Sequence, residues 1–305
     1  MRLQTIAPAK VNLVLRVGSP RRDGYHGIRS LMVPLDLGDR VDVSVGERTG
    51  PVTCRVPGRP ELDGAENLAA RAAERFRARF GVERTIAIRI AKRIPVTAGL
   101  GGGSSDAAAV LRCLARAFRI RDRAALAALA LEVGSDVPFF LGPGPAWAEG
   151  RGEKLTPADV PPQHLVLVYP DDPALAIRAG EAYRWLDASR QGRRPRLPPR
   201  FARFEPSRAG NDLQAPCLLE RPPLATLLGL LVGRGATAAI MSGSGPTVFG
   251  TFHSRNAAAR AARTIAEEVA DRKVMVLAAT TVRRHPGVTP WRSPRSASSP
   301  STKRS

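Results

Sequence analysis

The chain has 305 residues, of which 43% are hydrophobic and 24% are charged, the usual balance of a globular protein. No apolar run is long enough to cross a bilayer, and the first ten residues lack the apolar stretch of a secretory signal. The formal net charge of +20 raises nucleic-acid binding as a function, but no nucleic-acid-binding motif accompanies it.

Strand and helix patterns are mixed in the first part of the chain. Apolar and polar residues alternate as in half-buried strands over residues 3–17, 39–45 and 85–91, and a turn-rich loop spans 20–27. Apolar residues recur at helical spacing over residues 66–80, 104–118 and 123–133.

The second part carries a different mixture of elements. An unbroken apolar run predicts a buried strand at residues 165–169, and shorter strands are expected at 238–241 and 248–252. Helices are expected at residues 181–188, 223–233 and 256–271. Because no regular βαβ repeat emerges, we expect an α+β fold in two halves, residues 1–160 and 161–284, followed by a disordered basic tail at 285–305.

Two Arg-rich segments account for much of the charge. Residues 188–209 hold seven Arg and one Glu, and residues 283–305 hold five Arg and one Lys, so each segment contributes +6. Removing these 12 charges leaves about +8, which suits a protein with phosphorylated ligands. Nucleic-acid binding therefore stays a minor alternative.

Three cysteines, Cys54, Cys113 and Cys217, lie far apart and have no paired histidines nearby. This spacing argues against a structural zinc site and against a disulfide framework. It favours a reducing, cytoplasmic setting.

The most specific pattern is a glycine- and serine-rich loop between a predicted strand and a predicted helix. Side-chain-free backbone can wrap an anion closely, and the free N–H groups and dipole of the helix start favour negative charge. We therefore predict that the triphosphate of a nucleotide binds here. The predicted binding residues are Pro95, Val96, Thr97, Ala98, Gly99, Leu100, Gly101, Gly102, Gly103, Ser104 and Ser105.

Other interpretations of this loop fit less well. A Walker A loop requires a lysine after its last glycine, and none follows Gly103. A Rossmann fingerprint requires a third glycine where Ser104 stands, and an acidic residue after a second strand. A loop without a ligand would have no use for so many flexible residues.

The extended loop motif resembles that of the GHMP kinases, a family that includes galactokinase, homoserine kinase and mevalonate kinase. Within the family, the chain is similar to the branch that phosphorylates the 2-hydroxyl of 4-diphosphocytidyl-2-C-methyl-D-erythritol in the methylerythritol phosphate route to isoprenoids. Five stretches carry the likeness, in order from about residue 6 to about 282: residues 7–13, 22–26, 99–108, 134–140 and 241–247. The resemblance implies an N-terminal half like ribosomal protein S5 domain 2, a ferredoxin-like C-terminal half, and ATP with Mg²⁺ as cofactors.

Lys10 and Asp136 are the candidate catalytic residues. A carboxylate beside an ammonium can accept the proton of a substrate hydroxyl, and the ammonium can stabilise the attacking oxygen. Taken alone, Asp136 is better explained as a helix cap. The resemblance places both residues at the family's catalytic pair and reverses that preference. Glu149 is a weaker acidic candidate with a structural role as the alternative.

The resemblance also implies a substrate site. Asn12, two residues after Lys10 on the same strand face, is expected to position the substrate hydroxyl, with a hydrogen bond within the sheet as the alternative. The pair Tyr25 and His26 is expected to recognise cytosine, one by stacking and one by hydrogen bonding, with Tyr183 as the second stacking face. Asp136 also contacts substrate in this interpretation.

The chain departs from the family pattern in places. Arg178 and Ala179 replace small hydroxyl residues before Tyr183, which leaves the local substrate contacts open. The loop at residues 241–247 is expected to close over the reacting centre, with a tight hairpin as the alternative. For Mg²⁺, the sequence offers only Ser105 as a candidate ligand.

Two other functions remain open at this stage. The chain could phosphorylate another small alcohol, such as homoserine or mevalonate, although Tyr25, His26 and the triple glycine argue against this. It could also be a catalytically silent relative that acts as a sensor or nucleic-acid binder. An inactive form would be expected to lose Lys10 or Asp136, and both are present. The oligomeric state is not predicted.

Overall fold

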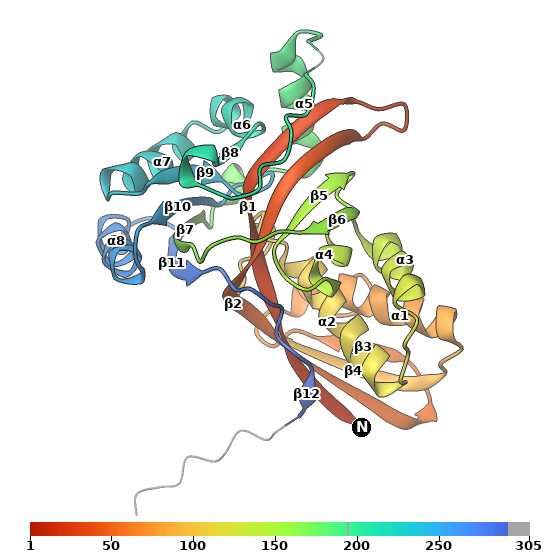
Figure 1. Cartoon of the computed structure of the whole chain (residues 1–305). Helices are drawn as coiled ribbons and strands as arrows, with labels where there is room; N and C mark the ends of the chain where they lie inside the picture. Colours follow the sequence, from red (N-terminus) through yellow and green to blue (C-terminus); the bar gives the residue numbers. More distant parts are fainter. Residues whose placement is uncertain (194, 292–305) are drawn as a thin grey trace, which may run out of the picture.

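The computed structural model describes residues 1–193 and 195–291, and its strands form two sheets (Figure 1). The first sheet comprises β1 (Arg2–Pro20), β2 (His26–Thr49), β3 (Val52–Arg55), β4 (Arg84–Ala91), β5 (Ala146–Gly150), β6 (Lys154–Pro157), β8 (Gly210–Asn211) and β12 (Thr289–Pro290). The second sheet has the order β11-β7-β10-β9 and comprises β7 (His164–Pro170), β9 (Ala238–Met241), β10 (Val248–Phe252) and β11 (Val274–Thr280).

The helices are divided between the two sheets (Figure 1). Four follow the N-terminal strands: α1 (Leu68–Phe80), α2 (Gly102–Ala117), α3 (Arg123–Val133) and α4 (Val137–Leu141). Four belong to the C-terminal half: α5 (Ala179–Arg190), α6 (Gln214–Glu220), α7 (Pro223–Gly233) and α8 (Arg255–Glu268). Short 3-10 helices lie at Pro60–Leu62, Pro173–Leu175 and Pro206–Arg208.

Local sequence signals explain where helices begin and end. The side chain of Asn67 accepts a hydrogen bond from the first turn of α1, and Asp122 does the same for α3. Gly81 ends α1 in the left-handed conformation that glycine adopts at low cost. Helix α2 differs, because Gly101 precedes it without any side-chain cap. Its first N–H groups therefore remain available to a ligand.

Strands β1 and β2 form a long antiparallel ribbon that runs through the whole molecule (Figure 1). One hydrophobic core lies between the first sheet and α1, α2 and α4, and a second lies between the other sheet and helices α5 to α8. A third core, which includes Val11, Leu13, Leu167 and Phe249, lies between the two sheets. Because β1 contributes to all three cores, its register fixes both halves relative to each other.

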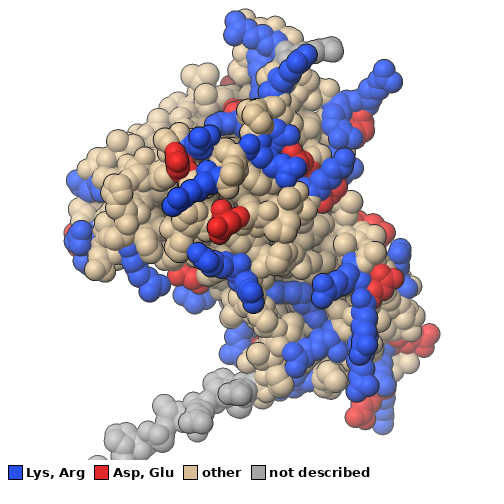
Figure 2. All heavy atoms as spheres, in the orientation of Figure 1, with Lys and Arg blue, Asp and Glu red and all other residues tan. Residues whose placement is uncertain are grey.

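These elements confirm most of the sequence predictions. The predicted strands and helices are present, and the expected α+β class is confirmed. Helix α2 begins two residues earlier than predicted, because Gly102 and Gly103 are helical. Lys and Arg side chains are spread over the face in Figure 2 with acidic side chains among them. None of the helices over the described residues combines the length and apolar character needed to traverse a bilayer.

The prediction of a disordered tail is wrong for residues 285–291, which pack along the N-terminal half as a C-terminal strap. Arg112 and Arg116 of α2 donate hydrogen bonds to strap carbonyls at 2.7 Å each, and β12 pairs with β1. His285 donates through Nε2 to the Phe139 carbonyl at 3.1 Å, and its ring packs against Phe139 and Phe140. These partners come from distant parts of the chain, so composition could not reveal them. The remainder of the predicted tail, 292–305, lies outside the described residues.

The strap gives stability a pH dependence. Burial lowers the pKa of His285 from its ordinary value of 6.5 to about 4. The unfolded chain therefore binds more protons between these values, and the free energy of unfolding falls as the pH is lowered through this interval, by at most about 1.4 kcal/mol per pH unit from this group.

We expect the variant His285→Gln to lack this part of the slope. Urea unfolding of both proteins at steps from pH 7 to pH 4 measures the difference. Parallel stability curves over that interval would show that His285 is not buried in its neutral form.

Candidate active site

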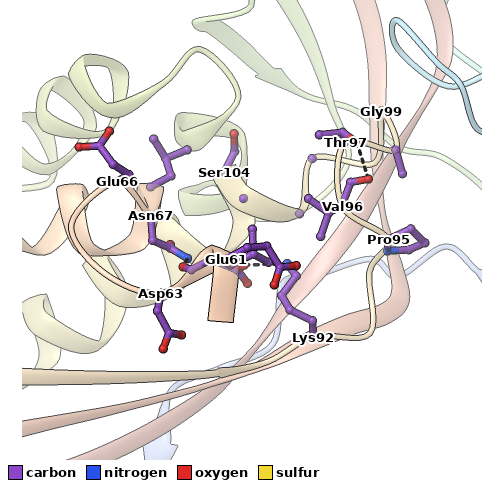
Figure 3. Close-up of a pocket in the computed structure, with 17 residues that line it drawn as sticks. Glu61, Asp63, Glu66, Asn67, Lys92, Pro95, Val96, Thr97, Gly99 and Ser104 are labelled. Carbon is purple, nitrogen blue, oxygen red and sulfur yellow. Dashed lines mark hydrogen bonds and ion pairs between the residues drawn. The ribbon is translucent and has the colours of Figure 1, made fainter. Parts of the chain in front are cut away.

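The glycine- and serine-rich loop lines a cavity of about 420 Å³ between the end of β4 and the start of α2 (Figure 3). Nine of the eleven predicted phosphate-binding residues line it: Pro95, Val96, Thr97, Ala98, Gly99, Gly101, Gly102, Gly103 and Ser104. Leu100 and Ser105 do not, because their side chains are buried in the protein. The opposite wall is formed by residues 61–63 and 66–68.

Close contacts explain two of the glycines. Gly99 and Gly101 have φ values of +75° and +72°, which side chains disfavour. A Cβ atom at Gly101 would lie 3.0 Å from Lys10 Cγ and 3.0 Å from Phe140 Cζ. A Cβ atom at Gly99 would lie 2.5 Å from the Ser242 carbonyl. The loop is thus pressed against β1, α4 and the loop between β9 and β10.

Lys10 and Asp136 both line a second cavity, of about 540 Å³. This cavity meets the first one at Gly99 and Gly101. Lys10 Nζ lies 3.8 Å from Asp136 Oδ2. Asp136 occupies the position before α4, yet its carboxylate makes no capping hydrogen bond. The carboxylate, with 40% of the side chain exposed, therefore faces the ammonium and the cavity instead of the helix.

The ammonium of Lys10 is almost completely withdrawn from water. It donates a hydrogen bond to Asn12 Oδ1 at 2.7 Å, and Asn12 donates to Ser30 Oγ at 2.7 Å. Burial lowers the pKa of Lys10, and the neighbouring carboxylate of Asp136 opposes part of this effect. An ammonium in such surroundings interacts strongly with any negative charge that develops beside it.

Irregularities in β1 direct these side chains toward the loop. The pairing of β1 with β2 shifts between Pro8 and Lys10 and again between Asn12 and Val14. Such bulges re-aim side chains next to functional sites. The backbone N–H of Lys10 also donates to the Leu100 carbonyl at 2.9 Å, which attaches the strand to the loop.

The C-terminal half completes the site through the loop at residues 241–247. Ser242 Oγ donates to the Gly99 carbonyl at 3.1 Å, and a Cβ atom at Gly243 would lie 3.3 Å from Lys10 Nζ. The segment is the connection of the β9–β10 hairpin and also a wall of the second cavity. Asn211, which the sequence did not single out, donates to the carbonyls of Met241 and Gly243 and fixes this loop.

The predicted substrate residues all line the second cavity. They are Asn12, Tyr25, His26, Asp136 and Tyr183. Tyr25 is 49% exposed, and the guanidinium of Arg151 lies 3.9 Å from its ring centre. The Tyr183 ring stacks on His26 at 5.0 Å between centroids. Ala179, one of the departures from the family pattern, also lines the cavity.

Glu149 lies outside both cavities and pairs with Arg29 and Arg200.

The sequence did not predict a buried cluster of charged side chains beneath the glycine- and serine-rich loop. Lys92 Nζ bonds both Asp39 and Asp106, and Asp39 also accepts the backbone N–H groups of Arg93 and Ile94. Burial raises the pKa of Asp106 to about 8, against the opposing effect of Lys92. The signal in the sequence was Asp39, an acid on the inward face of the strand that also carries Val41 and Val43.

The loop geometry predicts a contrast between two glycines. Gly101→Ala places a Cβ against Lys10 and Phe140 at positive φ, so we expect it to lower the free energy of unfolding by about 1–3 kcal/mol. Gly103→Ala is the matched control, because a Cβ there would meet no atom within 4 Å and would favour the helix. Urea unfolding without nucleotide measures both. Equal effects of the two substitutions would contradict the packing described here.

Known proteins resemble this chain along its whole length. The family models for the GHMP kinases N terminal domain and GHMP kinases C terminal match residues 67–144 and 196–271. A 4-diphosphocytidyl-2-C-methyl-D-erythritol kinase of Anaeromyxobacter sp. is 97% identical over the full length of both chains. The protein of the same name from Deinococcus radiodurans is 42% identical over 86% of this chain and 88% of its own.

Solved structures agree with this assignment. The crystal structure of a 4-(cytidine 5'-diphospho)-2C-methyl-D-erythritol kinase has 33% identity and a TM-score of 0.75, covering 92% of this chain and 99% of that chain. A homoserine kinase from Cytophaga hutchinsonii is 17% identical, with a TM-score of 0.71 over 94% of this chain and 97% of its own, and so shares the fold. The chain therefore belongs to the GHMP kinase family, in the branch of the 4-diphosphocytidyl-2-C-methyl-D-erythritol kinases.

Proposed function

We propose that this chain transfers the γ-phosphate of ATP to the 2-hydroxyl of 4-diphosphocytidyl-2-C-methyl-D-erythritol, a step toward isoprenoid precursors. The observation that carries the proposal is the pairing of Lys10 with Asp136 beside Gly101, where the two cavities meet. One cavity then holds the phosphate donor and the other the acceptor alcohol, with the charged pair between them. The names of the relatives supply the identity of the substrate.

The triphosphate of ATP binds along the backbone of residues 99–103 and the start of α2 in this proposal. The free N–H groups and the helix dipole attract its charge. Adenosine occupies the opposite wall, residues 61–63 and 66–68, because the acidic side chains of Glu61, Asp63 and Glu66 disfavour phosphate there. The buried Lys92 cluster supports the loop from beneath.

In the reaction, the oxygen of the substrate hydroxyl forms a bond to the γ-phosphorus while the bond from that phosphorus to the leaving ADP oxygen breaks. Asp136 accepts the hydroxyl proton as the transfer proceeds. Lys10, held by Asn12, stabilises the charge on the attacking oxygen. Exclusion of water by the loop at 241–247 strengthens these interactions.

Mg²⁺ is proposed as the partner of ATP, where it neutralises charge on the phosphates. The described residues contain no cluster of three His, Cys, Asp or Glu side chains suited to a metal ion. Magnesium at nucleotide sites takes most of its ligands from phosphates and water, so few protein groups are needed. Asp106 lines the cavity at the start of α2, and its Oδ1 atom lacks a hydrogen-bond partner, so it fits this requirement. The hydroxyl of Ser105, the ligand that the sequence offered, also lacks a partner but is buried away from the cavity.

We further propose a division into residues 1–160, with the ATP loop, and 161–284. The cytidine end of the substrate is assigned to Tyr25, His26 and Tyr183, which share a cavity with the catalytic pair. The widely spaced and buried cysteines support a cytoplasmic location. A small-molecule partner, in place of a nucleic acid, fits the dispersed basic side chains.

Release of ADP, measured with a coupled assay, tests the substrate. We expect turnover with the cytidyl substrate and none above background with homoserine or mevalonate, because the acceptor cavity carries aromatic and histidine side chains suited to a base. Faster turnover of either small alcohol would instead favour another GHMP kinase activity. Release with none of the three would favour the catalytically silent alternative.

Substitution of the charged pair tests the chemistry. We expect Lys10→Ala and Asp136→Ala each to reduce kcat by about 10²–10⁴-fold, since each removes a group that acts on the reacting oxygen. ATP affinity should be largely kept, because the loop backbone is unchanged. Glu149→Gln is the control acid, tied to Arg29 and Arg200 outside both cavities, and should keep its turnover. Near wild-type kcat in either alanine variant would refute its catalytic role.

A further inference from the structure

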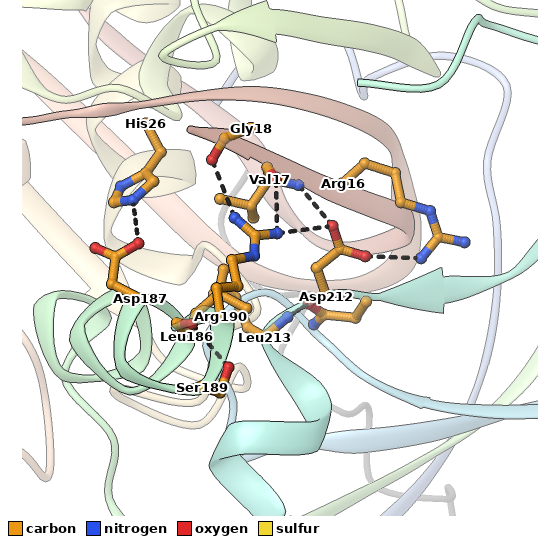
Figure 4. A network of polar contacts seen from close by, with 11 residues as sticks. Arg16, Val17, Gly18, His26, Leu186, Asp187, Ser189, Arg190, Asp212 and Leu213 are labelled. Carbon is orange, nitrogen blue, oxygen red and sulfur yellow. Dashed lines mark hydrogen bonds and ion pairs between the residues drawn. The ribbon is translucent and has the colours of Figure 1, made fainter. Parts of the chain in front are cut away.

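Helix α5 meets the tip of the β1–β2 hairpin through two side chains that lie one helical turn apart. Tyr183 stacks on the His26 ring at 5.0 Å between centroids and an interplanar angle of 26°. Asp187 Oδ1 lies 2.9 Å from His26 Nε2 (Figure 4). The His26 side chain is only 8% exposed. Its imidazole is therefore held in one orientation at the wall of the substrate cavity.

A second set of contacts anchors the end of the same helix (Figure 4). Arg190 donates to the carbonyls of Val17 and Gly18 at 2.7 and 3.1 Å and lies 3.4 Å from Asp212. Asp212 also accepts the backbone N–H of Val17 at 2.9 Å. With its end fixed to β1 in this way, α5 presents Asp187 to His26 at a set position.

The hydrogen bond to Asp187 determines where the proton of a neutral His26 resides. An ionised carboxylate only accepts hydrogen bonds, so Nε2 must carry the hydrogen. Nδ1 is then a hydrogen-bond acceptor. Among the described residues, no side chain or backbone group is hydrogen-bonded to Nδ1.

We propose that Asp187 is a positioning residue that sets base specificity by fixing His26 in the tautomer with an acceptor at Nδ1. This inference rests on the proposed function, in which the substrate carries cytosine. Cytosine presents an exocyclic amino group, a donor that Nδ1 can accept, whereas uracil presents a carbonyl oxygen at the same position. The fixed tautomer therefore favours cytosine. With uracil, Nδ1 and the carbonyl oxygen would be two hydrogen-bond acceptors that face each other.

The isosteric variant Asp187→Asn separates tautomer control from mere bracing of the loop. An amide can accept from Nε2–H or donate to a bare Nε2, so it keeps the contact and releases the choice of tautomer. If Asp187 only braced the loop, the Asp187→Asn variant would keep the base preference of the wild-type protein. If Asp187 controls the tautomer of His26, the variant would lose that preference.

The test is calorimetric binding of cytidine 5'-diphosphate and uridine 5'-diphosphate to the full chain, with saturating ADP to occupy the ATP site. We expect the wild-type protein to bind the cytidine compound about tenfold or more tightly, the difference that one well-placed hydrogen bond provides. In Asp187→Asn this ratio should fall toward one. Glu220→Gln, which neutralises an exposed acid on neighbouring α6 outside the cavity, should keep the wild-type ratio.

Nitrogen NMR of the His26 ring in the free protein gives a second measurement, with His26→Gln to assign its signals. We expect a protonated Nε2 and a bare Nδ1 in the wild type, and a mixture of tautomers in Asp187→Asn. An unchanged base ratio in Asp187→Asn, or a wild-type protein that binds both compounds equally, overturns the proposal. Because neither measurement needs turnover, a chain inactive on the cytidyl substrate would refute the proposed function alone.

Discussion

A lysine ammonium withdrawn from water is the constraint on which this site depends. An unpaired buried charge costs several kcal/mol, so Lys10 requires partners on every side. Asn12 accepts its hydrogen bond, Asp136 supplies an opposite charge, and Gly101 leaves the space that its stem occupies. Each partner comes from a different element, so the fold must bring β1, the glycine loop and the start of α4 together before the lysine can be buried. The arrangement of the proposed reacting centre thus follows from the need to satisfy one buried charge.

The two halves of the chain meet at the same point. Ser242 holds the Gly99 carbonyl, and the Tyr169 hydroxyl donates to the Val96 carbonyl at 3.1 Å, so the second sheet fixes the loop that belongs to the first. The C-terminal strap returns from β11 and packs on α4 through His285, while its Pro286 carbonyl accepts a hydrogen bond from Arg112 of α2. Phosphoryl transfer needs donor and acceptor in a fixed geometry, and contacts of this kind supply it from both sides.

The parts of the candidate site that are local in sequence could be predicted, and those that depend on distant residues could not. The glycine loop, its strand and helix, and the alternation that places Lys10 and Asn12 on one face follow from short-range patterns. Pairing Lys10 with Asp136 needed the family resemblance, because residues 126 positions apart carry no mutual signal in one sequence. The strap at 285–291 and the contact of Asp187 with His26 were missed for the same reason. Asp39 and Asp106 could have been noticed as acids on apolar faces, yet only the fold reveals that the ammonium of Lys92 contacts both.

The most direct test of this account is a crystal structure of the protein with a non-hydrolysable ATP analogue and the cytidyl substrate. We expect a triphosphate wrapped by the backbone of residues 99–103, with its terminal phosphate directed at the substrate hydroxyl between Lys10 and Asp136. A triphosphate bound elsewhere, or a hydroxyl out of reach of both residues, would contradict it.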